Sequence, residues 1–278
     1  MVAWGSNSNA QASVPAGLSG VVAIAAGTLH SLALKSDGTV AGWGWNISGQ
    51  ATPPVDLSGV VAIAAGTRHS LALRDDGTVV GWGTRDLAAS TVPGGLSGVS
   101  AIAAGNGYSL ALKSDGTVVG WGSNAYGAAV PPFDLSDVVA ISGGLDHAVA
   151  LKRDGTVAGW GTNDFGEATP PAGLKGVLAV SAGGSHNLAL VATLPALVGQ
   201  VQALSPPLSQ GEVNSVVQKL WSAQSALNRG QAKAACGQLG AATGQIGAFV
   251  QSGRLTAAQA NPLLTAVATL RAPLPCGN

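Results

Sequence analysis

The stretch LSGVVAIAAGTLHSLALKSDGTVAGWGWNISGQATPPVD, residues 18–56, decides the fold because the chain repeats it. Three further whole copies follow it without a break, and partial copies occupy residues 1–17 and 174–191. A Trp-Gly pair recurs every 39 residues, at Trp4, Trp43, Trp82, Trp121 and Trp160. Self-similarity at a fixed period of this length is the signature of a repeat architecture.

Each unit is expected to form three antiparallel strands. In the first whole unit, residues 21–25 and 31–34 are short apolar runs of the kind that buried strands show. The SDGT step at 36–39 contains the Asp-Gly pair that favours a tight hairpin, and a third strand follows at 39–44. The prolines at 53–54 argue against another central strand, so the rest of the unit is a return connection.

Antiparallel units of this size with one large aromatic each are typical of a β-propeller, in which every small sheet is a blade. The periodic tryptophans are interpreted as packing between blades, because one such ring buries about 150–250 Å². Joining residues 1–17 to 174–191 would add one split blade and give five blades in this chain, without exposed strand edges. Met1 stands at the position of Val40, in mid-strand, which favours a longer parent protein with upstream repeats and a targeting segment. A parent with seven blades is the alternative to five.

Polar residues keep the same period. A ring of equivalent histidines at His30, His69, His147 and His186 would suit a metal, but Tyr108 takes this position in the middle unit. A hydrogen bond between ring and blade beside the glycine turn explains the pattern, and we expect this structural role. The aspartates of the SDGT turns are expected to cap their own hairpins. The pattern therefore predicts no metal and no cofactor.

Two sets of loops are expected to share one face, because the first and third strands of each unit run in the same direction. One set contains the residue before the periodic histidine, which differs in every unit, and the other contains the fifth residue after tryptophan. Aromatic and arginine side chains commonly anchor protein interfaces. The alternative is that these side chains only cover loop backbone. The candidate partner-binding residues are Leu29, Trp45, Arg68, Arg85, Leu87, Tyr126, Asp146 and Phe165.

The segment GVVAIAAGTLHSLALKSDGTVAGWG at 20–44 and the loop pattern Trp-Gly-x-Asn-x-x-Gly-Gln at 43–50 resemble the regulator of chromosome condensation repeat family, in the short form common in bacteria. The resemblance covers residues 1–191. In repeat style the chain is similar to the secreted propeller-type β-lactamase inhibitory proteins, which implies protein binding by the loop face. The family also includes guanine nucleotide exchange factors, and fold alone does not carry function. The loop after Trp82 departs from the pattern, with Arg85 in place of asparagine.

Residues 192–278 are rich in alanine, glutamine and leucine and are expected to form a small α-helical bundle. Ser209 with Glu212 predicts a capping box at the start of one helix, another helix is expected over 231–251, and Thr256 with Gln259 predicts the start of a further one. The region resembles the FIMAH domain at the C-termini of secreted bacterial proteins, which implies attachment or interaction outside the cell.

Both cysteines, Cys236 and Cys276, lie in this helical region. A disulfide between them would stabilise a small bundle by roughly 3–4 kcal/mol and would indicate an oxidising compartment. Two free thiols are the alternative, and a metal or redox site is disfavoured because no Cys-x-x-Cys spacing is present.

The chain holds 13 basic and 13 acidic residues, and only 9% of its residues are charged, which argues against a nucleic-acid partner. It contains no apolar run of the roughly 20 residues that a membrane span needs. Neither a nucleophile elbow, a phosphate-binding loop nor a His-Glu-x-x-His motif occurs, so an enzyme is not expected. The sequence therefore predicts a non-enzymatic extracellular or cell-surface protein that binds a protein partner. The alternatives are a carbohydrate-binding module, and an exchange factor or enzyme built on the propeller.

Overall fold

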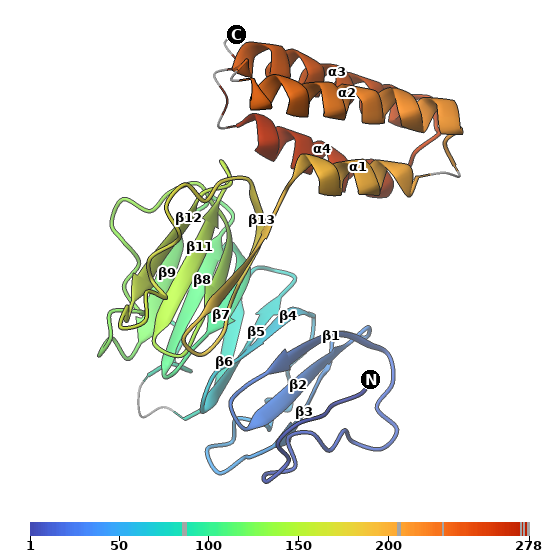
Figure 1. Ribbon diagram of the computed structural model, residues 1–278. Helices are drawn as coiled ribbons and strands as arrows, with labels where there is room; N and C mark the ends of the chain where they lie inside the picture. Colours follow the sequence, from blue (N-terminus) through green and yellow to red (C-terminus); the bar gives the residue numbers. More distant parts are fainter. Residues whose placement is uncertain (85–87, 205–206, 230, 273, 275, 277–278) are drawn as a thin grey trace. The chain divides into compact units, whose positions relative to one another are not determined.

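A computed structural model describes the chain except for residues 85–87, 205–206, 230, 273, 275 and 277–278 (Figure 1). The described part is mainly β, with four helices at its C-terminal end. Contacts along the chain group it into two compact units. The first comprises residues 1–153, 157–172 and 180–188, and the second comprises 154–156, 173–179 and 189–278.

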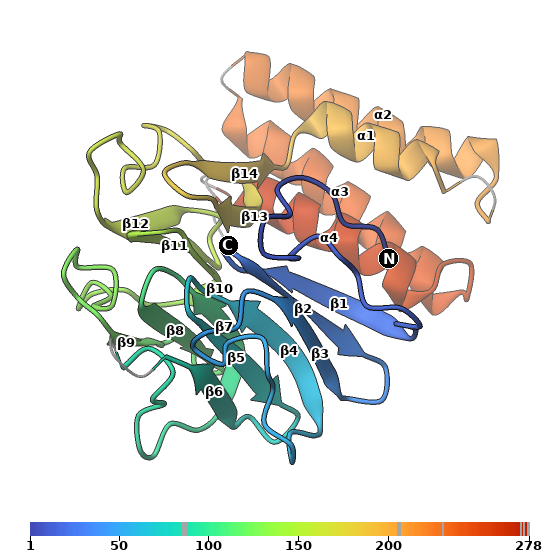
Figure 2. The ribbon, with the colours of Figure 1, turned by 90° about the horizontal axis from the view of Figure 1, so that it is seen from below.

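The repeats form small antiparallel sheets, one per unit. The first sheet contains β1 (Val21–Ala26), β2 (His30–Lys35) and β3 (Val40–Gly44), and its register pairs Ser31 with Trp43. This confirms the predicted three-stranded blade. The next three sheets are β4 (Val60–Ala65), β5 (His69–Arg74), β6 (Val79–Gly83); β7 (Val99–Ala104), β8 (Tyr108–Lys113), β9 (Val118–Gly122); and β10 (Val138–Gly143), β11 (His147–Lys152), β12 (Val157–Gly161). Figure 2 shows these blades following one another in chain order.

An Asp-Gly-Thr turn, SDGT at 36–39 in the first unit, closes each hairpin as predicted. Gly38 has a φ of 77°, a left-handed conformation that a glycine adopts without steric cost. The Asp37 carboxylate accepts the Thr39 N–H at 3.0 Å and the Thr39 hydroxyl at 2.6 Å. Hydrogen bonds from Lys35 and Thr39 hold the pKa of Asp37 well below its usual value. The predicted capping role of this aspartate is confirmed.

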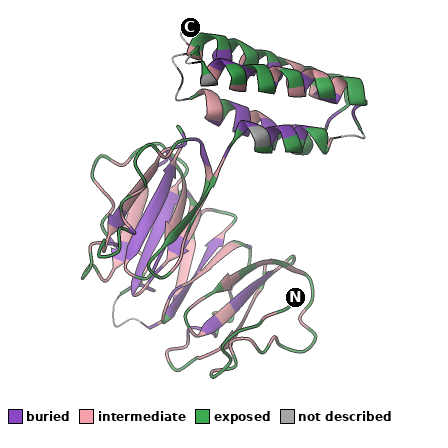
Figure 3. Cartoon of the chain, viewed as in Figure 1, coloured by how far each residue is buried: buried purple, intermediate pink, exposed green. Residues whose placement is uncertain are grey.

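Neighbouring blades are held together by the second strands and the tryptophans. The middle strands are the most buried part of each sheet, as Figure 3 shows. Trp82 packs with Leu32 and Leu34 of the preceding blade, and its indole N–H donates to the carbonyl of Gln50 at 2.9 Å. Trp121 and Trp160 are buried in the same way. The predicted packing role of these tryptophans is confirmed.

The last sheet of the series has two strands, β13 (Val177–Ala182) and β14 (Asn187–Val191). The predicted split blade is not formed, because residues 1–5 are not a strand and Trp4 is 87% exposed. Leu188 on β14 is 67% exposed, whereas its counterpart Leu32 is fully buried. One physical reason is that Ala3 stands where complete blades have glycine.

Gly42 is the counterpart of Ala3 in the first complete blade. A Cβ placed on Gly42 would collide with the carbonyl oxygen of Ala51, which belongs to the return loop of the same blade. A third strand that carries alanine at this position therefore cannot pack in the same way unless that loop moves.

The helical region contains α1 (Leu194–Gln202), α2 (Gln210–Asn228), α3 (Ala232–Gln251) and α4 (Ala257–Arg271), packed around an apolar core. The predicted capping boxes are both present: Ser209 with Glu212 begins α2, and Thr256 with Gln259 begins α4. No helix in the described residues is long and apolar enough to cross a membrane.

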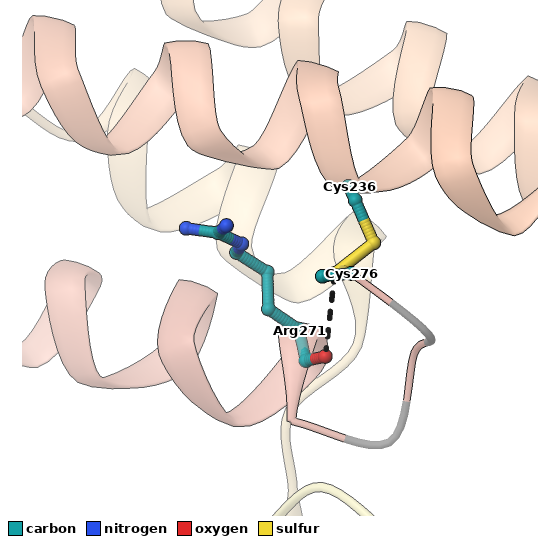
Figure 4. Close-up of a disulfide and its surroundings, with 3 residues drawn as sticks. All are labelled: Cys236, Arg271 and Cys276. Atoms are coloured by element: carbon teal, nitrogen blue, oxygen red, sulfur yellow. Dashed lines mark hydrogen bonds between the residues drawn. A yellow bond between two sulfur atoms is a disulfide. The ribbon is translucent and has the colours of Figure 1, made fainter. Parts of the chain in front are cut away.

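A disulfide joins Cys236 on α3 to Cys276 in the C-terminal tail, with their Cα atoms 5.5 Å apart (Figure 4). The Cys276 sulfur also lies 3.7 Å from the carbonyl oxygen of Arg271, at the end of α4. The expected bridge is therefore present, and it ties the tail back to the third helix.

Candidate interaction face

The two predicted loop sets meet at one end of the blades. The turn after the first strand and the loop after the third strand are joined by a backbone hydrogen bond in every complete blade. Trp45 donates to the carbonyl of Leu29 at 2.8 Å, and Thr162 donates to that of Asp146 at 2.8 Å. We call this surface the loop face; it consists of the turns at 27–29, 66–68, 105–107 and 144–146 and the described parts of the loops at 45–50, 84–90, 123–128 and 162–167.

The loops of this face are shaped by an asparagine three residues after the periodic tryptophan. The Asn46 side chain accepts the N–H of Ala51 at 2.8 Å and donates to the Thr52 hydroxyl at 2.7 Å. The same contacts recur around Asn163, and Asn7 also accepts a loop N–H. The loops after Trp4, Trp43 and Trp160 therefore share this frame, while the residues at their tips differ.

Two of the predicted aromatic residues stand exposed on this frame. Tyr126 is 58% exposed and Phe165 is 82% exposed, each at the tip of its own loop. The N–H of Phe165 donates to the carboxylate of Glu167 at 2.8 Å, which holds the tip in place. The candidates Arg85 and Leu87 lie outside the described residues.

Trp45 and Arg68 come together although they belong to neighbouring repeats. The guanidinium carbon of Arg68 lies 5.6 Å from the centroid of the Trp45 ring, a cation–π contact. Trp45 is half-buried as a result, whereas Arg68 is exposed. Leu29 is half-buried beside Trp45, with its carbonyl taken by the Trp45 N–H.

Asp146 is likewise bound to the repeat that precedes its own. Its carboxylate accepts from the amide nitrogen of Asn106 at 3.1 Å. Arg68 and Asp146 thus present opposite charges at different places on the loop face, each held by a partner from an adjacent blade.

Sequence reasoning missed Ile47 and Leu145, which are both exposed on this face. Leu145 lies at the rim of a shallow hollow of about 250 Å³ formed by the glycine turns of the first strands. The signal was available, because Leu145 stands where the other three complete units have threonine or asparagine. An apolar residue at an otherwise polar turn position indicates a surface feature special to that blade.

Beneath the loop face, His30, His69 and His147 bridge consecutive blades, whereas His186 is exposed. His30 Nε2 lies 2.9 Å from the hydroxyl of Ser70, and this hydroxyl donates to the carbonyl of Gln50 at 2.9 Å. Because serine has one hydroxyl proton, the histidine nitrogen must be the donor. Burial lowers the pKa of His30 and His69 to about 4, so the rings are neutral. The described residues contain no group of three side chains suited to a metal ion.

Four segments of the chain, residues 21–50, 60–84, 99–128 and 138–167, match the regulator of chromosome condensation (RCC1) repeat. These segments are RCC1 repeats. Each begins at or within a first strand, and three of the four extend through the loop that follows Trp-Gly, so the RCC1 match coincides with the blades and the loop face. No curated protein matches the sequence.

Solved RCC1-like structures share the fold. Human WBSCR16 is 24% identical with a TM-score of 0.52, over 62% of this chain and 58% of that protein. Prp20p of Saccharomyces cerevisiae is 21% identical with a TM-score of 0.52, over 61% of this chain and 55% of that protein. The ectodomain of the Physcomitrella patens receptor kinase CR4 is 26% identical with a TM-score of 0.52, over 65% and 50%. This chain therefore spans between 50% and 58% of the length of these proteins.

Proposed function

We propose that this protein is a non-enzymatic interaction module that binds a protein partner through the loop face. The observation that carries the proposal is the exposure of Tyr126 and Phe165 at the tips of two loops, the second of which is held by backbone hydrogen bonds to the side chains of Asn163 and Glu167. Large aromatic side chains on a rigid frame bury much area at low conformational-entropy cost. The Arg68–Trp45 pair adds an exposed guanidinium on the same face.

Solved relatives lend support to a protein partner. Prp20p is described with its binding to Gsp1p and histones, and in complex with Kap60. The glycan alternative at Trp45 is less favoured, because Arg68 already lies over its ring. The disulfide supports a location in an oxidising compartment, outside the cell or at its surface.

The test is capture of the partner from the growth medium and surface extract of the source organism, followed by identification and measurement of Kd. Replacing Trp45, Tyr126 and Phe165 together by alanine should weaken binding at least about a hundredfold, as expected for the loss of anchor residues. The control is Phe133→Ala. Phe133 is a fully exposed aromatic in the return connection that enters β10 beside the hairpin glycine Gly116, at the opposite end of the blades.

Equal binding by the triple variant and the wild type would place the site elsewhere. The same purified protein should neither speed nucleotide release from a small GTPase nor show turnover. Either activity would replace the proposed role with that of an exchange factor or an enzyme.

A further inference from the structure

A groove runs along the outer side of α2 beside the first turns of α3, far in sequence from the RCC1 repeats. Its volume is about 630 Å³. The groove is lined by Asn214, Val217, Gln218, Trp221, Ser222, Ser225, Ala226, Arg229, Ala234 and Gln238. All of these residues belong to the helical region, so the groove is formed within one compact unit.

Trp221 is the aromatic centre of this groove. The core of the bundle takes the opposite face of α2, where Val213, Val216 and Leu220 are buried. Trp221 is 47% exposed, and it is the one large apolar side chain that is exposed in the described part of the helical region. The core does not need this ring, and its flat face is available to a ligand.

A small residue on α3 keeps the groove open. Ala234 lines it, and a longer side chain at this position would fill the space beside α2.

The other lining groups are mostly uncharged donors and acceptors. Gln218, Ser222, Ser225 and Gln238 are exposed, and none of their side chains has a hydrogen bond to another described residue. Their amides and hydroxyls are therefore free to bind a polyhydroxylated ligand while Trp221 contacts its apolar face.

Two cationic groups border this surface. Arg229 lines the groove itself, and Lys219 lines an adjoining hollow of about 440 Å³ that shares Gln218, Ser222 and Gln238. Ten helical residues separate the two cations, a rise of about 15 Å. Neither hollow is lined by an acidic residue, and the Glu212 carboxylate is paired with Arg254.

We propose that this groove binds an acidic oligosaccharide. One face of a sugar ring presents C–H groups that stack on tryptophan, while its edge presents hydroxyls to the glutamines and serines. Carboxylates on the sugars would pair with Arg229 and Lys219. A nucleic-acid strand fits less well, because its affinity depends on many phosphate contacts and the groove offers two cations.

Binding is tested by calorimetric titration of the oxidised, full-length protein with tetragalacturonate, with maltotetraose as the neutral probe. We expect tetragalacturonate to bind with a Kd below about 1 mM, more weakly as salt is raised, and at least about tenfold more tightly than maltotetraose. Trp221→Ala should weaken binding at least about tenfold through loss of the stacking surface. Trp221→Phe should restore part of it, and Gln202→Ala, an exposed glutamine on α1 outside the groove, should have no effect.

The double variant Lys219→Gln with Arg229→Gln should remove most of the salt dependence and the preference for the acidic probe. The absence of tetragalacturonate binding, equal affinity for both probes, or unchanged affinity in Trp221→Ala would each overturn the proposal. Circular dichroism establishes that each variant is folded.

This inference is separate from the proposed function. Trp221→Ala should leave capture of a protein partner unchanged, and the triple variant of Trp45, Tyr126 and Phe165 should leave sugar binding unchanged. Either proposal can therefore fail without the other.

Discussion

At the residue scale, consecutive blades are joined by a hydrogen bond from a ring in one blade to an acceptor in the next. Where the ring differs between blades, the acceptor differs with it. His30 and His69 each donate to a serine of the next blade. The blade after Tyr108 has Ala148 in place of this serine, and the tyrosine hydroxyl instead donates to the backbone carbonyl of His147. His147 in turn donates to the side-chain amide oxygen of Asn187, and the side-chain amide nitrogen of Asn187 donates to the carbonyl of Glu167 at 2.7 Å.

Replacing Ser70 by alanine should lower the free energy of unfolding by about 1–3 kcal/mol, because it leaves the buried Nε2–H of His30 without an acceptor. The control is Ser31→Ala. Ser31 holds the same place in the first blade and donates to the carbonyl of Gln11, but no histidine donates to it. Urea unfolding measures both variants, and equal losses would contradict the importance of the hydrogen bond from His30.

The same histidines predict a pH dependence. Their folded-state pKa is about 4 and their ordinary value is 6.5, so the neutral ring is favoured in the folded chain. Their contribution to stability is complete above pH 6.5 and is lost as the pH falls from 6.5 through 4. The urea concentration at the midpoint of unfolding should therefore decrease as the pH is lowered from 7.5 to 4.5. A smaller fall is expected in the double variant His30→Asn with His69→Asn, and an identical fall would exclude these rings as the cause.

At the element scale, the strands and helices are specified by residues close in sequence, whereas the C-terminal tail is held to α3 by the disulfide. Reducing the bridge between Cys236 and Cys276 should destabilise the bundle by about 4 kcal/mol, the loop-closure estimate for a separation of 40 residues. Thermal unfolding followed at 222 nm, with and without reductant, measures the change. The variant Cys236→Ala with Cys276→Ala should match the reduced protein, and an unchanged transition would show that the bridge does not stabilise the bundle.

At the scale of the whole molecule, the two compact units predict that unfolding is not a single transition. Six of the seven tryptophans lie in the repeats and one lies in the helices, so fluorescence reports mainly on the blades. Reductant should lower the helical transition seen by circular dichroism and leave the fluorescence transition in place. A common shift of both signals would show that the units unfold together.

The sequence by itself determined the parts of this protein that depend on neighbours within one repeat or one helix. The 39-residue period specifies the blades, Asp37 and Gly38 specify the hairpin, and Ser209 with Glu212 specifies the start of α2. Each of these features is made by residues a few positions apart, so a local pattern is sufficient to predict it.

Only the tertiary structure decided what depends on contacts between repeats. The partner of His30 is 40 residues away, and the pairing of Trp45 with Arg68 needs two blades to be packed together. The split blade failed for the same reason: residues 177–191 form two strands as predicted, but residues 1–5 form none, and Ala3 stands where Gly42 of a complete blade lies against a loop that is close only in the folded blade. The sequence likewise did not indicate a binding site at Trp221, because the groove exists only when α3 packs beside α2.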